Sequence, residues 1–174
     1  MYDFSRESEF VRMYEDWFPK VYNYIFYRLL SKEITEDLVS DVFLKVVSHL
    51  HRFDSAKASF GTWLFTIARN TLTDFYRKSK PALSLDDDGF PSDSLTVDWD
   101  EQCRLIENED RRALYKALGQ LNEKQRSVLA LKYFSGFNNR EIARMTGMKE
   151  STVSSLGIRA LSKLKSVMDD TCAV

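Results

Sequence analysis

The sequence predicts an all-helical fold built from two small domains. Of 174 residues only 6 are Gly and 3 are Pro, whereas 44% are apolar and 13% aromatic. This content of turn residues is too low for a fold of many strands and hairpins. Apolar residues recur at helical spacing through residues 10–75 and again from residue 105, with an aperiodic stretch between. We therefore expect helical domains at residues 1–80 and 108–174, joined by a flexible linker at residues 81–107.

Four helices are predicted in the first domain. The first two meet at Pro19, which is expected to be the first position of the second helix because proline is tolerated there. The third is predicted to start at Thr35, a suitable N-cap, and to reach Leu50. A loop at residues 52–59 then leads into a fourth helix, which starts at Phe60.

Charge is distributed unevenly, although the formal net charge is only −1. Residues 52–80 carry 6 basic and 2 acidic side chains, and residues 111–174 carry 12 basic and 5 acidic ones. Residues 81–110, which include the linker, carry 1 basic and 10 acidic side chains. Two basic regions separated by an acidic one suggest nucleic-acid binding by both domains.

Several classes of site have no support in the sequence. Cys103 and Cys172 have no Cys or His neighbour at a ligand spacing, so we expect no metal site and no disulfide. His49 and His51 end an apolar helix, where solvation explains them. Without a nucleophile–base pair or phosphate loop, we expect no enzyme activity, no cofactor and no small-molecule substrate. Without a signal segment or long apolar run, we expect a cytoplasmic chain with no membrane insertion.

Residues 139–164 have the pattern of a helix-turn-helix. Such a motif needs a small residue where its helices cross, a turn residue that tolerates positive φ, and an apolar residue early in the second helix. Ala143, Gly147 and Val153 have these properties at the required spacing, and Ile142 and Leu161 are expected to complete the core. Two capping boxes predict the neighbouring helix starts, Asn122 with Gln125 and Asn138 with Glu141.

The second helix of this motif is expected to enter the major groove of duplex DNA, with basic neighbours on phosphates. An ordinary three-helix domain with a solvated basic face is the alternative. The candidate contact residues are Arg140, Lys149, Glu150, Ser151, Thr152, Ser154, Ser155, Arg159 and Lys163.

The fourth helix mixes aromatic and basic residues, which suits unpaired DNA because aromatic rings stack on bases and cations follow the backbone. The candidates are Trp63, Arg69, Asn70, Tyr76, Arg77 and Lys78. For Trp63, periodicity leaves open whether the ring is core or contacts a base. The third helix has an acidic outer face, either simply solvated or a surface for a partner protein.

Together these stretches resemble the sigma-70 family of transcription initiation factors. TEDLVSDVFLKVV at 35–47 resembles region 2.2, residues 59–78 resemble regions 2.3 and 2.4, and residues 121–165 resemble region 4.2 with its helix-turn-helix. With no further domain between these regions, the chain is most similar to the small extracytoplasmic-function group.

The resemblance implies binding to core RNA polymerase and promoter DNA. The β′ clamp helices of the polymerase would hold the third helix, the β flap would hold the C-terminal domain, and the two DNA sites would take the minus-ten and minus-thirty-five elements. The residues implied in clamp binding are Asp37, Leu38, Asp41, Val42, Phe43 and Lys45.

The resemblance also implies a role for the linker and a regulator. The linker would thread the RNA exit path as a mimic of nascent RNA, with a solvated spacer as the alternative. An anti-sigma factor is expected to inhibit the chain and could hold it at the membrane. Many relatives carry basic residues where this chain has Ser154 and Leu156, and Gly157 weakens its helix. A dimeric helix-turn-helix regulator with an N-terminal sensor domain is the alternative function.

Overall fold

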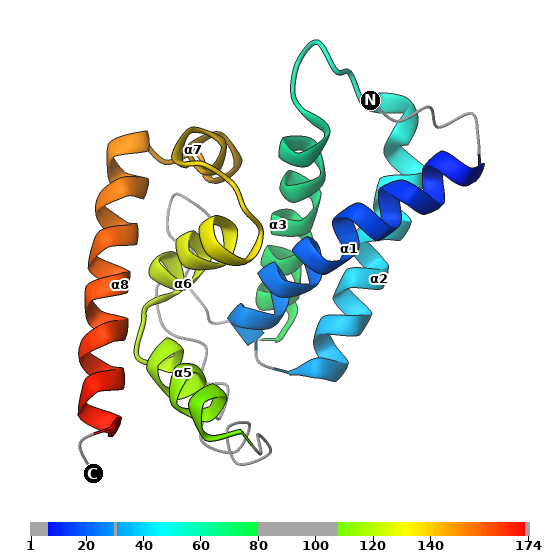
Figure 1. Cartoon of the computed structure of the whole chain (residues 1–174). Helices are drawn as coiled ribbons and strands as arrows, with labels where there is room; N and C mark the ends of the chain where they lie inside the picture. Colours follow the sequence, from blue (N-terminus) through cyan, green and yellow to red (C-terminus); the bar gives the residue numbers. More distant parts are fainter. Residues whose placement is uncertain (1–6, 30, 80–107, 173–174) are drawn as a thin grey trace.

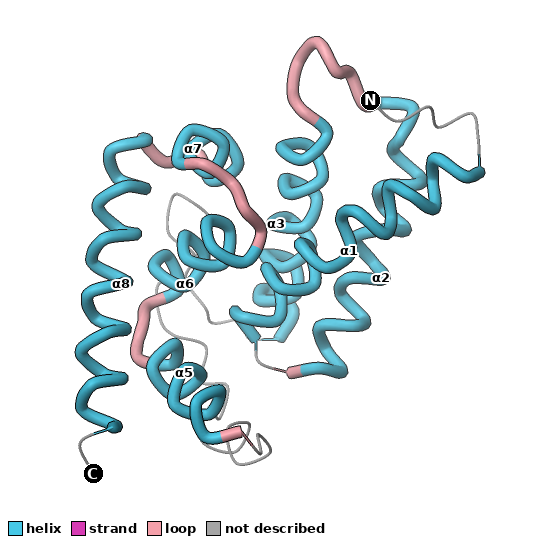
Figure 2. Tube along the Cα trace, in the orientation of Figure 1, coloured by secondary structure: helices cyan, strands magenta, loops and turns pink. Residues whose placement is uncertain are grey.

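The computed structural model describes residues 7–29, 31–79 and 108–172, and this part of the chain is built from helices and loops without a strand (Figure 2). The expected linker at residues 81–107 lies outside the described residues. No described helix is both long and apolar enough to cross a bilayer. The elements in chain order are α1 Glu7–Leu29, α2 Lys32–His49, the 3₁₀ helix η1 Leu50–Arg52, α3 Phe60–Ser79, α5 Glu109–Gly119, α6 Glu123–Leu129, the π-helix η2 Ala130–Phe134, α7 Asn139–Thr146 and α8 Glu150–Cys172.

Helix α1 is continuous, so the prediction of two helices that meet at Pro19 is wrong. Pro19 lies inside the helix and is exposed. A proline in a helix interior removes one backbone hydrogen bond and normally costs stability. Met13, Val21 and Ile25 on the same helix are fully buried, on both sides of the proline. The apolar face of α1 therefore keeps the helix in one piece by packing.

Helix α2 begins four residues earlier than predicted. Its N-cap is Ser31, whose Oγ accepts a hydrogen bond from the backbone N–H of Ile34 at 3.4 Å. Thr35, the predicted cap, is buried within the helix and donates its hydroxyl to the carbonyl of Ser31 at 2.6 Å. Helix α3 begins at Phe60 as predicted.

Both predicted capping boxes are confirmed. The side chain of Asn122 accepts from the N–H of Gln125, and that of Asn138 accepts from the N–H of Glu141, each with the reciprocal bond present. Two backbone donors at each helix start are satisfied in this way. The positions of α6 and α7 follow from local sequence.

The helix-turn-helix is present in α7 and α8. Gly147 ends α7 with φ of 77°, a left-handed conformation that glycine adopts without strain, and its N–H bonds the carbonyl of Ala143. Val153 and Ile142 are fully buried as expected. The prediction for Leu161 is wrong, since it is 40% exposed and the neighbouring Ala160 fills the core position. A shift of one residue turns a side chain by about 100° around the helix.

The unusual residues of α8 serve its packing on α6. Leu156 is 7% exposed, and Gly157 is buried with room for a Cβ only 3.7 Å from Cγ1 of Val128. A larger side chain at position 157 would push α8 away from α6. Leu156 therefore faces the core of this half and not the DNA.

The chain forms two groups of helices, which lie side by side. The N-terminal half contains α1, α2, η1 and α3, and the C-terminal half contains α5 to α8; α7 contacts α3, and α6 and η2 contact α1. Helix α8 lies at the outer edge, with α6 and α7 between it and the N-terminal half (Figure 1).

Candidate nucleic-acid interface

An open pocket of about 270 Å³ lies between α2 and α3, here named the α2–α3 pocket. Helix α2 and η1 contribute three basic side chains to it, and α3 contributes the rest. Positions 63, 67, 70 and 71 share one face of α3 because they are separated by whole helical turns. The lining residues are Lys45, His49, Arg52, Trp63, Ile67, Asn70 and Thr71.

Hydrogen bonds fix the basic side of this pocket. Lys45 donates from Nζ to Oγ1 of Thr71 at 3.0 Å, which ties α2 to α3. The ring nitrogen Nδ1 of His49 lies 2.8 Å from the carbonyl oxygen of Lys45. The pocket thus combines a held ammonium group and a held imidazole with an aromatic wall, a combination suited to a nucleobase and its phosphate.

Trp63 is both a packing residue and a wall of the pocket. Its ring is half-buried and packs beside Phe53 and Phe60, with centroids at 5.3 Å and 5.7 Å. The remaining part of the ring faces the α2–α3 pocket, together with the exposed Asn70. Phe65, two residues further on, is 1% exposed and belongs to the core.

Four of the six predicted minus-ten residues do not line this pocket, and two of these four contact the C-terminal half. Tyr76 is 1% exposed, and its hydroxyl donates to Glu123 of the C-terminal half at 3.2 Å. Burial, together with the nearby carboxylate of Glu123, raises the pKa of Tyr76 above its ordinary value. Arg69 is half-buried and donates from Nη1 to the carbonyl of Met145 at 2.9 Å. In this structure Tyr76 cannot stack on a base, because its ring lies in the interface between the halves.

Arg77 and Lys78 lie at the end of α3 with exposed side chains. Arg77 pairs with Asp74 at 3.9 Å, and both side chains are more than half exposed. Exposed pairs of this kind are weak and exchange readily with other partners. Both cations are therefore accessible to a phosphate backbone.

The outer face of α2 agrees in part with the face that the sequence predicted for a partner. Asp37 and Asp41 are exposed as expected, whereas Leu38, Val42 and Phe43 are buried in the core of the N-terminal half. Lys45 is directed at Thr71 and the α2–α3 pocket. The exposed face instead carries Asp37, Ser40, Asp41, Leu44 and Val47, of which Leu44 is 68% and Val47 50% exposed. We name this set the α2 face.

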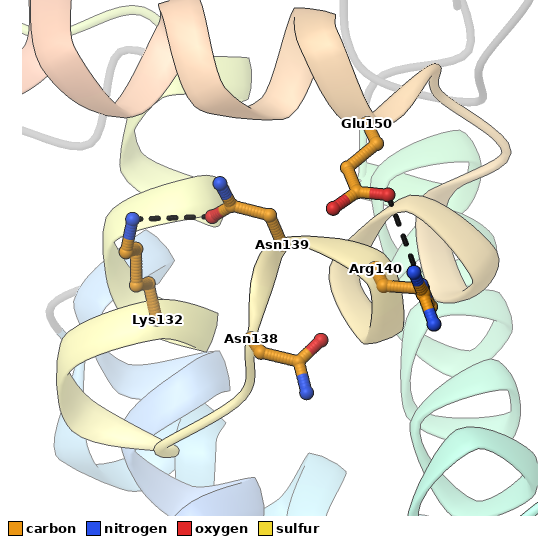
Figure 3. Close-up of a pocket in the computed structure, with 5 residues that line it drawn as sticks. All are labelled: Lys132, Asn138, Asn139, Arg140 and Glu150. Atoms are coloured by element: carbon orange, nitrogen blue, oxygen red, sulfur yellow. Dashed lines mark hydrogen bonds and ion pairs between the residues drawn. The ribbon is translucent and has the colours of Figure 1, made fainter.

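A second open hollow, of about 470 Å³, lies beside the helix-turn-helix and is here named the HTH hollow. Figure 3 shows its five lining residues, Lys132, Asn138, Asn139, Arg140 and Glu150. Lys132 donates to Oδ1 of Asn139 at 3.1 Å, and Arg140 lies 3.9 Å from the carboxylate of Glu150. Two cations against the single carboxylate of Glu150 leave the hollow with an excess of positive charge, which favours an anion such as a phosphate.

The N-terminal turn of α8 is accessible. Lys149, Glu150, Ser151, Thr152, Ser155 and Arg159 are exposed, and Ser154 is half-buried. Arg159 donates from Nε to the carbonyl of Ser155 at 3.3 Å. Lys163 is exposed, and its Nζ donates a hydrogen bond to the carbonyl oxygen of Gln120 at 2.6 Å. The arrangement leaves one helix turn free to enter a groove, flanked by the basic HTH hollow.

Comparison with known proteins identifies the family. Residues 13–81 match the family model described as sigma-70 region 2, and residues 111–164 match that described as sigma-70, region 4. The ECF RNA polymerase sigma factor SigX of Bacillus subtilis is 30% identical over 173 residues, covering 94% of this chain and 85% of SigX. The chain belongs to the sigma-70 family of sigma factors, in its ECF group. Members of this group direct RNA polymerase to promoters.

Other relatives agree with this assignment. The ECF sigma factor BldN of Streptomyces coelicolor is 32% identical over 161 residues, which cover 92% of this chain but only 61% of BldN. Two solved structures show the same fold. One is RpoE with the anti-sigma factor NepR from Bartonella quintana, with a TM-score of 0.72, 24% identity and coverage of 92% and 97%. The other is CnrH with the cytosolic domain of CnrY, with a TM-score of 0.67, 22% identity and coverage of 95% and 90%.

Sequence reasoning missed several residues of this sigma factor's surfaces. Arg52 and His49 line the α2–α3 pocket. In the sequence, the one relevant signal is that they lie at a predicted helix end and at the start of the following loop. Leu44 and Val47 belong to the exposed α2 face, and the sequence marked neither of them as a candidate for partner binding. Lys132 lies in the π-helix η2 and lines the HTH hollow. No local pattern in the sequence predicts this π-helix.

Proposed function

We propose that this sigma factor binds core RNA polymerase through the α2 face and holds promoter DNA at two sites. Unpaired bases of the minus-ten element enter the α2–α3 pocket, and the N-terminal turn of α8 reads the minus-thirty-five duplex. The observation that carries this proposal is the convergence of Trp63, Asn70 and three basic side chains on one pocket. A cytosolic factor of this kind acts by positioning the polymerase and catalyses no reaction itself.

Promoter-directed transcription tests the proposal as a whole. Purified full-length chain, added to core polymerase on a template with a cognate promoter, is expected to yield a run-off product well above that of core enzyme alone. A product no greater than with core alone contradicts the proposal. The alternative is a dimeric helix-turn-helix regulator with a sensor domain, which would bind DNA without any affinity for core polymerase. Membership of the sigma-70 family favours the initiation factor.

The α2 face joins two acidic side chains to exposed leucine and valine, a composition typical of a protein-binding surface. We therefore assign the β′ clamp helices to this face, with Asp37 and Asp41 flanking Leu44. The β flap is assigned to the C-terminal half, and the acidic linker at residues 81–107 to the RNA exit path. An anti-sigma factor as a regulator is a further part of the proposal, supported by the similar fold of RpoE, which was solved with the anti-sigma factor NepR. Retention of the complex at the membrane is proposed with it.

Leu44→Asp is expected to lower the affinity for core polymerase at least tenfold. The side chain is 68% exposed, so the substitution leaves the fold intact, but a carboxylate at the centre of an apolar contact cannot be paired. Fluorescence anisotropy of labelled protein titrated with core polymerase measures the effect. Leu44→Met is the matched control and should bind like the wild type. Equal affinities for Leu44→Asp and the wild type would exclude Leu44 from the polymerase interface.

Arg159→Ala is expected to weaken duplex binding and to flatten its salt dependence by about one unit of log–log slope, as for one lost phosphate contact. Arg159 is exposed on α8, and its Nε donates to a backbone carbonyl of its own helix. Titrations of promoter duplex at several salt concentrations give the slope. Lys116→Ala, an exposed cation on α5, is the control and should keep it. If the Arg159→Ala slope equals that of the wild type, Arg159 does not contact a phosphate.

A further inference from the structure

The first turn of α8 carries one acidic side chain. Residues 149–152 are all exposed, and Glu150 is the carboxylate among them. In α7 the carboxylate of Glu141 has a structural task, because its Oε2 accepts from the backbone N–H of Asn138 in the capping box. Glu150 instead lines the HTH hollow. A carboxylate at this place is repelled by the phosphates of DNA, so it lowers affinity unless a base offsets the repulsion.

The carboxylate of Glu150 is directed across the HTH hollow toward the start of α7. Its Oε2 lies 3.9 Å from Nε of Arg140, and the two side chains are 56% and 74% exposed. The attraction between exposed charges is small, but it favours this orientation of the carboxylate. Figure 3 shows the other carboxylate oxygen turned away from Arg140 and toward the hollow. One oxygen is therefore beside a cation, and the other remains for a ligand.

The core of the helix-turn-helix fixes where Glu150 lies. Val153, three residues further along α8, is fully buried, and Gly147 sets the turn between α7 and α8 with its positive φ. The beginning of the second helix is the part of such a motif that meets base edges in the major groove. Glu150 is the first residue of α8, so its carboxylate lies where base edges are expected.

A carboxylate discriminates among the four bases because it only accepts hydrogen bonds. In the major groove, guanine presents the acceptors N7 and O6, and thymine presents O4 and a methyl group, so neither base can donate to it. Adenine offers its N6 amino group, but the acceptor N7 lies beside that group and repels the carboxylate. Cytosine offers its N4 amino group without an acceptor of its own beside it in the groove. Cytosine is therefore the base that suits Glu150.

We propose that Glu150 reads a cytosine of the promoter duplex by accepting a hydrogen bond from its N4 amino group, and that Arg140 is the positioning residue that holds the carboxylate. This role of Glu150 rests on the proposed function, which places the first turn of α8 in the minus-thirty-five duplex. Opposite any other base the carboxylate loses water without gaining a donor, which lowers the affinity for that sequence. Glu150 thus acts mainly by excluding the wrong sequences.

Selection from a duplex library tests the role of Glu150. Holoenzyme assembled from the full-length chain and core polymerase is offered a cognate promoter whose minus-thirty-five segment is randomised over about one helical turn, roughly ten base pairs. The wild type is expected to favour cytosine about fivefold or more at one position. Glu150→Gln should favour adenine at that position, because an amide pairs with both N6 and N7 of adenine. Glu150→Ala should accept all four bases there.

Asp169→Asn is the matched control, because Asp169 is an exposed carboxylate in the last turns of the same helix. It should select the same sequences as the wild type. Glu150 also stabilises the start of α8 as an acidic residue in its first turn, but a loss of helix stability would fall equally on all bases. The ratio of affinities between bases therefore reports the contact with cytosine and not the stability of α8.

Two variants of Arg140 test its positioning role. Arg140→Met should reduce the preference for cytosine at least twofold, and Arg140→Lys, which keeps a cation beside Glu150, should restore it. Arg140→Met should also bind all duplexes more weakly if the guanidinium contacts a phosphate, but a phosphate contact carries no base preference. A loss of affinity that is equal for all four bases would overturn the positioning role of Arg140.

A base without the amino group gives the most direct comparison. In the selected duplex the cytosine is replaced by 2-pyrimidinone, which lacks the N4 amino group. Wild-type holoenzyme should bind this duplex about fivefold or more weakly, whereas Glu150→Ala should bind both duplexes equally. Equal losses in both proteins, or a preference for cytosine that survives in Glu150→Ala, would overturn the role of Glu150 alone. If no duplex is enriched above the background of core polymerase, the proposed function fails as well.

Discussion

Arg126→Ala is expected to lower the free energy of unfolding by about 3–5 kcal/mol, the cost of breaking a buried ion pair by removing one partner. Arg126 is 1% exposed and is among the largest fully buried side chains. It donates to Glu123 at 2.9 Å and to the carbonyl of Leu121 at 2.7 Å. Its removal leaves a buried carboxylate with one guanidinium less and a carbonyl without its charged donor.

Urea unfolding followed by circular dichroism measures this loss. Arg112→Ala is the matched control, since the Arg112 side chain on α5 is 41% exposed and pairs with the exposed Glu109 at 3.6 Å. It should change stability by no more than about 0.5 kcal/mol, as is usual for exposed sites. A loss of unfolding free energy below about 1 kcal/mol for Arg126→Ala would contradict the prediction. It would mean that Arg28, whose Nε also donates to Glu123, and solvent stabilise the Glu123 carboxylate fully without Arg126.

The sequence revealed the structure wherever the cause was local. The capping boxes at Asn122 and Asn138 and the turn at Gly147 each depend on residues within four positions of one another, and all three form as predicted. The predicted core of the helix-turn-helix differs from the observed one by one position, because Ala160 is buried and the predicted Leu161 is exposed. Short-range hydrogen bonds and helical periodicity are therefore sufficient for these elements.

Long-range contacts could not be predicted in this way. Arg28 and Glu123 are 95 positions apart in the sequence, and a charged residue in an isolated helix is expected to face water. Tyr76 looked like a DNA-binding aromatic because its neighbours are basic, yet the carboxylate that holds it comes from the other half. The exposure of Leu44 and the burial of Leu38 likewise depend on which face α1 and α3 cover. Tertiary packing therefore determines which of these side chains are buried and what they contact.

Trp63→Ala is expected to lower the ratio of open to closed promoter complexes about 5- to 150-fold while leaving closed-complex affinity nearly unchanged. Stacking of an aromatic on an unpaired base contributes about 1–3 kcal/mol, and that contact exists only after the strands separate. The part of the Trp63 ring that faces the α2–α3 pocket is available for this contact, and Asn70 and Arg52 lie on the same pocket. A fluorescent base in the minus-ten element reports opening, and anisotropy of the duplex reports the closed complex.

Trp63→Phe separates stacking from packing. The smaller ring retains a π-face for the base and is placed to pack beside Phe53 and Phe60, so it should preserve most of the open complex. If Trp63→Ala impaired closed-complex affinity as much as opening, the tryptophan would act by supporting the fold of α3 and not by holding a base. If neither step changed, the pocket would not be the minus-ten site, because its only aromatic wall among the described lining residues would be dispensable.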